Sequence, residues 1–268
     1  MKSWLKDVLC RVFVVREPKG LTRILTVKQA TGGSMFEKSS RQKLRHLRGD
    51  NTFGVMGLLT LAVVVAIAIL GSVVDSVYAE GGYTFVTKWG SQGTGNGQFA
   101  SVYEVVVDSS GNVYVADSHN HRIQKFDSNG NFITKWGSDG GGDGQFHFPY
   151  GLAIDSSNNI YVGDTYNYRI QKFDSNGNFI TKWGSQGTGD GQFLNGSGSI
   201  AVDSAGNVYA VDYYNARVHK FDSSGNFLLK WGSKGTGDGQ FCNLPINCGP
   251  WGIAVDSSDK VYVSDYGQ

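Results

Sequence analysis

The sequence of 268 residues is poor in proline, with four, and in cysteine, with three. So little proline argues against a proline-rich linker protein. From residue 51 onward the chain lacks the basic stripe that nucleic-acid binding needs, since its net charge there is −7. No G-x-G-x-x-G motif leads from an expected strand into a helix, which excludes a phosphate-cradling loop. The 13% aromatic residues, with many Val, Ile and Tyr residues, instead indicate a packed, β-rich body.

The basic residues gather at the N-terminus, where residues 1–50 carry a net charge of +8. Residues 53–74 follow without a charged side chain, a run long enough to cross a bilayer as a helix. The positive-inside rule then predicts that residues 1–50 form a cytoplasmic tail and that everything after the run is exported. We therefore expect residues 51–79 to be a transmembrane or signal-anchor segment.

Two outcomes stay open for this segment. An uncleaved anchor fits the length of the run and is the interpretation we favour. The Val-Tyr-Ala stretch that ends at Ala79 is a small-x-small pattern that would allow cleavage and secretion. Met35 would also serve as a start in place of Met1. In each case residues 80–268 are expected outside the cell, either bound to the cell membrane or secreted.

The exported part of the chain repeats one stretch of sequence. Residues 113–137 read VYVADSHNHRIQKFDSNGNFITKWG, and closely similar stretches return at 160–184 and 208–232. The tryptophans that end these copies, with Trp89 before them, are spaced 47 or 48 residues apart. A fixed period in this range is typical of a repeat architecture.

Each copy predicts four short strands separated by Asp/Asn/Gly turns. In the second copy the expected strands are 151–155, 160–164, 169–173 and 179–184. The first strand of each copy is nearly all apolar, as in a strand that is buried on both faces. Four-stranded units of this length that bury both faces against identical neighbours form the blades of a β-propeller. The closing tryptophan is then expected to pack between blades.

The stretch PYGLAIDSSNNIYVGDTYNYRIQKFDSNGNFITKWG resembles the NHL repeat, whose pattern includes Pro-x-Gly-hydrophobic-Ala-Val-Asp, Val-Tyr-Val-Ala-Asp and Asn-x-Arg. The resemblance covers residues 83–268 and departs where Val102 and Ser197 replace the family proline. It implies an all-β fold, an NHL-type β-propeller that is incomplete, with three full four-stranded blades and partial ones. Family propellers commonly have six blades. The chain is therefore a fragment, is completed by another chain, or keeps open edges that favour self-association.

Two recurring motifs are interpreted as structural, because the copies share them. The Asp-x-x-Asn-x-Arg element, for example Asp164, Asn167 and Arg169, is expected to pair Asp with Arg across strand ends. Its Asn is expected to satisfy backbone groups of the loop. The Gly/Asp linkers of the GTGDGQF type supply one acid each, too few for the oxygen ligands of Ca²⁺.

His119 and His121 form an H-x-H pair on the loop after the second strand, and His147 is a candidate neighbour. The resemblance implies an enzymatic alternative, since some NHL-type propellers are lyases whose central metal is held by histidines from several blades. Later copies replace both loop histidines with Tyr or Ala, so a ring of ligands does not form. We therefore expect exposed loop histidines, no metal and no cofactor.

The loops vary between copies where the strands and turns do not. When the copies are aligned on the next Asp, Tyr103, Tyr150, Gly198 and Trp251 occupy one blade position. In a propeller this position and the loop after the second strand lie on one face, which we call the loop face. The candidate ligand-binding residues on the loop face are Tyr103, Glu104, His119, His121, Tyr150, Tyr166, Tyr168, Tyr214 and Trp251. Tyr, Trp and one acid suit stacking on sugars, aromatic residues or peptides; the alternative is that these rings only plug the blade ends.

Two further sites follow from the residues. Cys242 and Cys248 bracket a short insert, and we expect a local disulfide because no His or acid completes a metal-ligand set. Asn195 begins an Asn-Gly-Ser sequon, a candidate glycosylation site in a host that glycosylates.

Together these patterns predict a membrane-anchored or secreted NHL-repeat propeller that is a non-catalytic binding scaffold for an extracellular protein, peptide or glycan. No Ser/His/Asp order and no paired acids can be argued from the sequence. Two alternatives stay open: a lyase or hydrolase with a channel metal, and a sensor ectodomain that signals to the basic tail.

Overall fold

The computed structural model describes residues 12–16, 22–26, 78–79, 83–194, 197–242 and 248–266. Within these ranges no helix combines the length and the apolar character that a bilayer crossing requires. The expected membrane segment 53–74, the alternative start Met35 and the sequon residue Asn195 lie outside the described residues.

Contacts divide the chain into two compact units. Most residues of four described strands belong to the smaller unit: β1 (Val12–Arg16), β2 (Thr22–Thr26), β3 (Tyr78–Ala79) and β4 (Tyr83–Trp89). They form one sheet in the order β2-β1-β4-β3. β1 and β2 fall within residues 1–50, where the sequence shows no sustained period. That segment therefore contains strand structure that the sequence pattern does not indicate.

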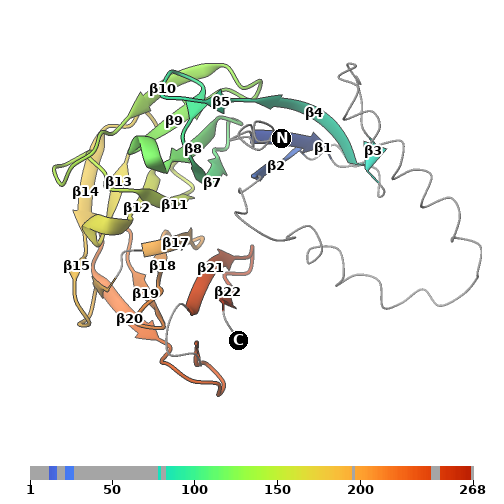
Figure 1. Cartoon of the computed structure of the whole chain (residues 1–268). Helices are drawn as coiled ribbons and strands as arrows, with labels where there is room; N and C mark the ends of the chain where they lie inside the picture. The colour runs from blue at the N-terminus through green and yellow to red at the C-terminus, as the bar shows by residue number, and fades with distance from the viewer. Residues whose placement is uncertain are drawn as a thin grey trace, which may run out of the picture. The chain divides into compact units, whose positions relative to one another are not determined.

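The larger unit, which includes residues 88–268, consists of antiparallel sheets that follow one another as blades, from green to red in Figure 1. Blade 1 is β7 (Val102–Val107), β8 (Val113–Asp117), β9 (Arg122–Phe126) and β10 (Phe132–Trp136). Blade 2 is β11 (Pro149–Ile154), β12 (Ile160–Asp164), β13 (Arg169–Phe173) and β14 (Phe179–Trp183). Blade 3 is β17 (Ser197–Val202), β18 (Val208–Asp212), β19 (Arg217–Phe221) and β20 (Phe227–Trp231). β21 (Gly249–Val255) and β22 (Val261–Tyr266) form a half-blade.

The glycine-rich linkers between blades share one backbone form. The first contains a parallel pair, β5 (Ser91–Gln92) with β6 (Gln98–Phe99), and the third contains the matching pair β15 (Ser185–Gln186) with β16 (Gln192–Phe193). In the other two linkers the same pairing is a single bridge, Asp139 with Phe146 and Lys234 with Phe241. Short 3₁₀ turns follow the second strands of blades 1 and 2: η1 (Ser118–Asn120) and η2 (Thr165–Asn167).

The structure confirms the all-β fold and the four-stranded units that the sequence predicts. β12 and β13 have the predicted bounds. The turn glycines at positions 111, 130, 177, 206 and 225 have φ between 81° and 90°, a conformation that favours glycine over residues with a Cβ atom. One expectation needs correction. The second strands β8 and β12 are buried along their whole length, whereas the first strand β7 is mostly half-buried.

The closing tryptophan of each blade packs against the next blade, as expected. Trp136 of blade 1 joins the core cluster that includes Ile160 and Phe173 of blade 2. Its ring centroid lies 5.8 Å from that of Phe173. Trp183 repeats the contact with Phe221 of blade 3, at 5.9 Å. Apolar burial between neighbours therefore holds the series of blades together.

The Asp-x-x-Asn-x-Arg element fastens each blade to the linker that precedes it. In blade 2, Arg169 Nε donates to Asp164 Oδ2 at 2.7 Å, and both side chains are buried. The Arg169 guanidinium also donates to the carbonyl oxygens of Gly141 and Gly142, each at 2.8 Å. Blades 1 and 3 repeat this clamp with Arg122 and Arg217. The element is structural, as the sequence predicts.

Candidate functional site

A cavity of about 500 Å³ lies where the first strands of successive blades meet. β7 packs against β11, β11 against β17, and β17 against β21. Six of the nine residues that the sequence predicts for the loop face line this cavity: Tyr103, Glu104, Tyr150, Tyr166, Tyr214 and Trp251. Among the described residues that line the cavity, Glu104 is the sole acid. The cavity therefore combines aromatic walls with one carboxylate.

A stacked tyrosine pair forms one wall of the cavity. The rings of Tyr103 and Tyr150 lie 3.9 Å apart between centroids, with planes only 8° from parallel. The edge of Tyr166 meets Tyr150 at 6.2 Å. Burial raises the pKa of Tyr150 above its ordinary value, and a hydrogen bond with Tyr103 adds to this effect. Tyr150 therefore stays a neutral phenol throughout the physiological pH range.

Blade 3 and the half-blade supply a second group of rings. Tyr213 meets Tyr214 edge-on at 4.9 Å and Trp251 at 5.6 Å, with interplanar angles of 85° and 82°. Trp251 remains 51% exposed while lining the cavity. Trp251 also lies 6.2 Å from Tyr266 of β22. A ligand with a flat or apolar face can stack on these rings.

Several lining residues are not among those that the sequence predicts, and two of them, Tyr213 and Tyr266, are aromatic. Tyr213 occupies the position directly after the clamp aspartate, where the other copies have the small residues Ser118 and Thr165. A comparison of the copies at that position would have found it. Tyr266 follows Asp265, which occupies the position of the clamp aspartate in the half-blade.

His119, His121 and Tyr168 do not line the cavity, although the sequence places them on the loop face with the others. Tyr168 follows η2 in a left-handed conformation, with φ 56°, and packs against the core cluster around Tyr161. His121 follows η1 with φ 52° in the equivalent position. Tyr168 thus packs against the core and His121 lies beside Asp139, whereas Tyr166, two residues before Tyr168, lines the cavity.

Two further predictions from the sequence concern the histidines and the cysteines. His119 is exposed as expected, whereas His121 and His147 are half-buried and lie beside Asp139. Cys242 and Cys248 are joined by a disulfide with their Cα atoms 5.0 Å apart, and both are buried.

Three segments of the chain match the family model of the NHL repeat: residues 104–126, 146–173 and 247–267. These segments are similar to the NHL repeat and make up about a quarter of the chain. The first two matched segments run from the first strand to the third strand of blades 1 and 2, and the last covers the half-blade. A comparison with curated proteins gives no match.

Several solved structures are similar to this chain at low identity. A structure titled streptogramin B lyase shares 18% identity with a TM-score of 0.45, covering 61% of this chain and 48% of that one. Virginiamycin B lyase from Staphylococcus aureus shares 15% with a TM-score of 0.47, covering 70% and 55%. Hydrazine synthase from Kuenenia stuttgartiensis shares 10% with a TM-score of 0.46, covering 60% and 41%. The chain thus spans about half the length of these proteins.

Proposed function

We propose that this protein is a non-catalytic binding module that holds its ligand in the aromatic cavity of the loop face. One observation carries the proposal. Aromatic side chains from three blades and the half-blade converge on a single cavity, at positions that differ between otherwise similar copies. Function commonly resides on variable loops over a constant scaffold.

The chemistry of the cavity indicates the ligand class. Its volume of about 500 Å³ suits a small ligand or the end of a longer chain. The stacked Tyr103 and Tyr150 present phenol groups beside apolar ring faces, and Trp251 offers an exposed indole. This combination fits a sugar unit of a glycan or an aromatic side chain of a peptide. Export of residues 80–268, which the charge pattern around residues 53–74 favours, would make the partner extracellular.

The test uses the full chain and two collections of probes, a glycan array and a library of aromatic peptides. The strongest hit is then titrated against Tyr150→Ala, Trp251→Ala and a control, Ile180→Ala. Ile180 lies on β14, is 48% exposed and does not line the cavity. Both cavity variants are expected to bind at least roughly tenfold more weakly, since truncation of an aromatic residue that anchors an interface typically costs about 2 kcal/mol or more.

The control variant is expected to bind like the wild type. Melting temperatures distinguish binding from folding, because the exposed Trp251 contributes little to the core. Equal loss of binding and stability in both cavity variants would instead support rings that only plug the blade ends. Unchanged affinity in both variants would overturn the proposed function.

A further inference from the structure

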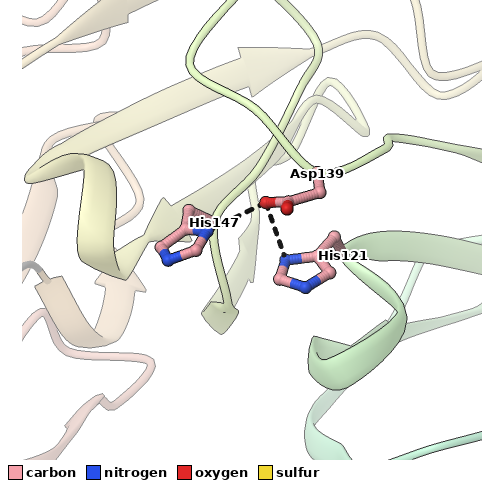
Figure 2. A group of neighbouring side chains, drawn as sticks. All are labelled: His121, Asp139 and His147. Atoms are coloured by element: carbon pink, nitrogen blue, oxygen red, sulfur yellow. Dashed lines mark hydrogen bonds and ion pairs between the residues drawn. The ribbon is translucent and has the colours of Figure 1, made fainter.

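Three chemically reactive side chains meet at the junction of blades 1 and 2 (Figure 2). His147 Nδ1 lies 2.9 Å from Asp139 Oδ1, and His121 Nδ1 lies 3.5 Å from the same oxygen. One ligand-type atom from each residue lies within 4.8 Å of the other two. The two imidazole rings are nearly parallel, with centroids 5.5 Å apart. All three residues thus point toward one small volume.

The repeats show that this group is peculiar to one junction. At the junction of blades 2 and 3 the equivalent positions hold Tyr168, Gln186 and Leu194. At the junction of blade 3 with the half-blade they hold Ala216, Lys234 and Cys242. The residues around these positions, including the linker glycines and the clamp, hardly change. At this junction alone, therefore, the three equivalent positions hold His, Asp and His, while the surrounding repeat sequence stays nearly the same.

The frame holds each of the three residues in position. The backbone N–H of His147 donates to the buried clamp residue Asp164 at 2.7 Å. Asp139 lies in the linker bridge with Phe146. His121 takes the left-handed conformation that its equivalents Tyr168 and Ala216 also take, with φ values of 52°, 56° and 51°. The backbone conformation at these three positions is shared by the repeats, so it does not depend on which side chains the positions carry.

The surroundings are partly closed. Phe148 lies against both histidines of the group, with ring centroids 4.7 Å from His121 and 5.0 Å from His147. The side chain of His121 is 18% exposed and that of His147 is 43% exposed. The side chain of Asp139 is 62% exposed, so the group stays accessible to solvent.

We propose that His121, Asp139 and His147 bind a divalent transition-metal ion, with Zn²⁺ as the best fit. Two imidazole nitrogens and one carboxylate form a borderline ligand set that suits Zn²⁺, whereas Mg²⁺ and Ca²⁺ prefer oxygen ligands. Tetrahedral ligands at about 2.0–2.2 Å from Zn²⁺ lie about 3.3–3.6 Å from one another. The 2.9 Å separation of His147 Nδ1 and Asp139 Oδ1 must therefore open slightly, whereas His121 Nδ1 and Asp139 Oδ1 are already 3.5 Å apart. His121 Nδ1 would also give up the backbone N–H of Phe148, which it accepts at 3.3 Å. Three protein ligands leave the fourth tetrahedral position to water or to an atom of a ligand. The ion would join blade 1 to the linker that leads into blade 2.

This inference is independent of the proposed function. The edge of Tyr166, which lines the cavity, lies 5.7 Å from the ring of His147. The metal site is therefore a neighbour of the cavity, but it shares no ligand residue with the cavity lining.

The repeats themselves supply the test variants. His121→Tyr, Asp139→Gln and His147→Leu each introduce the residue that the next junction carries at the same position, so the backbone is expected to accept them. His119→Tyr is the matched control, because His119 also contacts Phe148 but lies outside the group and has Tyr166 as its equivalent. Full-length protein, freed of metal by a chelator, is titrated with Zn²⁺ by calorimetry.

The wild type and His119→Tyr are expected to bind one Zn²⁺ per chain with equal affinity. Each ligand variant is expected to bind roughly 100-fold more weakly, since even groups that only orient a ligand affect metal affinity about 10–100-fold. Zn²⁺ is also expected to raise the melting temperature of the wild type and of the control, and not that of the ligand variants. Ligand variants that bind Zn²⁺ as tightly as the wild type would overturn the proposal, as would a wild type that binds none.

A second measurement needs no variant at all. Long-range ¹H–¹⁵N spectra of the wild type report the ring nitrogens of each histidine. Addition of Zn²⁺ is expected to shift Nδ1 of His121 and His147 and to leave His119 and His219 unchanged. Shifts confined to other histidines would show that the three residues form only a hydrogen-bonded group, and the proposal would fail.

Discussion

The indole ring of Trp136 lies so close to Gly177 that a Cβ atom built on this glycine would come within 2.6 Å of the ring. The same contact joins Trp183 to Gly225 and Trp89 to Gly130. The junctions of blade 1 with blade 2 and of blade 2 with blade 3 therefore each require a closing tryptophan on one side and a turn glycine on the other. The two residues are part of the same recurring sequence, one copy apart.

Gly177→Ala is expected to destabilise the blades for two additive reasons. The left-handed backbone, with φ 87°, costs an alanine about 1–2 kcal/mol. Displacing the Trp136 ring costs about 1–3 kcal/mol more, as overpacking does elsewhere. Gly144→Ala is the matched control, because Gly144 has φ 74° and no atom within 4 Å of its added Cβ. Chemical denaturation should show a clearly larger loss for Gly177→Ala; equal losses would contradict the packing argument.

Removal of the clamp arginine in blade 2 is expected to cost more than its conservative replacement. Arg169→Met leaves Asp164 buried without its cation, a change that typically costs about 3–5 kcal/mol. Arg169→Lys keeps the charge and loses the forked donation to the Gly141 and Gly142 carbonyl groups, so its cost should be smaller. Urea denaturation measures both. If Arg169→Met were as stable as the wild type, the clamp would not hold the linker.

At low pH, the free energy of unfolding should depend on the aspartates in the turns between strands. In blade 1, the side-chain hydrogen bond from Asn131 holds the pKa of Asp127 below its ordinary value of 3.8. Because the folded pKa is depressed, the ionised carboxylate stabilises the fold above the unfolded pKa, and this contribution is lost as pH falls through the folded pKa. Stability should thus stay level down to roughly pH 5 and fall below about pH 4.

Carboxyl NMR titration tests this at one residue. Asp127 should titrate below its ordinary range in the wild type and closer to that range in Asn131→Ala. The same titration of Asp222, whose pKa is lowered by Asn226, is an internal reference that the variant leaves unchanged. An Asp127 that titrates normally in the wild type would refute the assignment.

Reduction of the disulfide should destabilise the region before the half-blade. Cys242 and Cys248 close a loop so short that the chain-entropy model gives about 2 kcal/mol. Dithiothreitol should lower the melting temperature of the wild type and leave a Cys242→Ser/Cys248→Ser double variant unchanged. A reductant effect of the same size in the double variant would assign the loss to another group.

Much of the fold could be predicted because the strand and turn patterns, each weak when taken once, recur in every copy. The strand bounds 160–164 and 169–173 follow from turn residues that recur in every copy. The structural role of Asp164 and Arg169 follows from their recurrence as well. Recurrence could not show that the first strand β7 is less buried than β8, since burial depends on what packs against each strand.

The candidate sites were predicted only in part. Alignment of the copies placed Tyr103, Tyr150 and Trp251 together, because the position lies on one face of every blade. The alignment did not predict that Asp139 lies beside His121, because the linkers were interpreted as structural and their residues were not compared between copies. Comparison of Asp139 with Gln186 and Lys234 at the equivalent linker position carries that signal. Tyr168 packs against the core cluster and does not line the cavity that Tyr166 lines.

Every arginine clamp binds the linker that comes before its own blade, never the linker that comes after. The self-contained unit of this architecture therefore begins at a linker and ends at a tryptophan, as residues 138–183 do. Excising that unit with the following Gly184 would cut no clamp and would bring Trp136 to Gly225, a partner identical to the one it lost. Gene-level duplication or deletion can thus change the number of blades in a descendant without any new interface having to evolve.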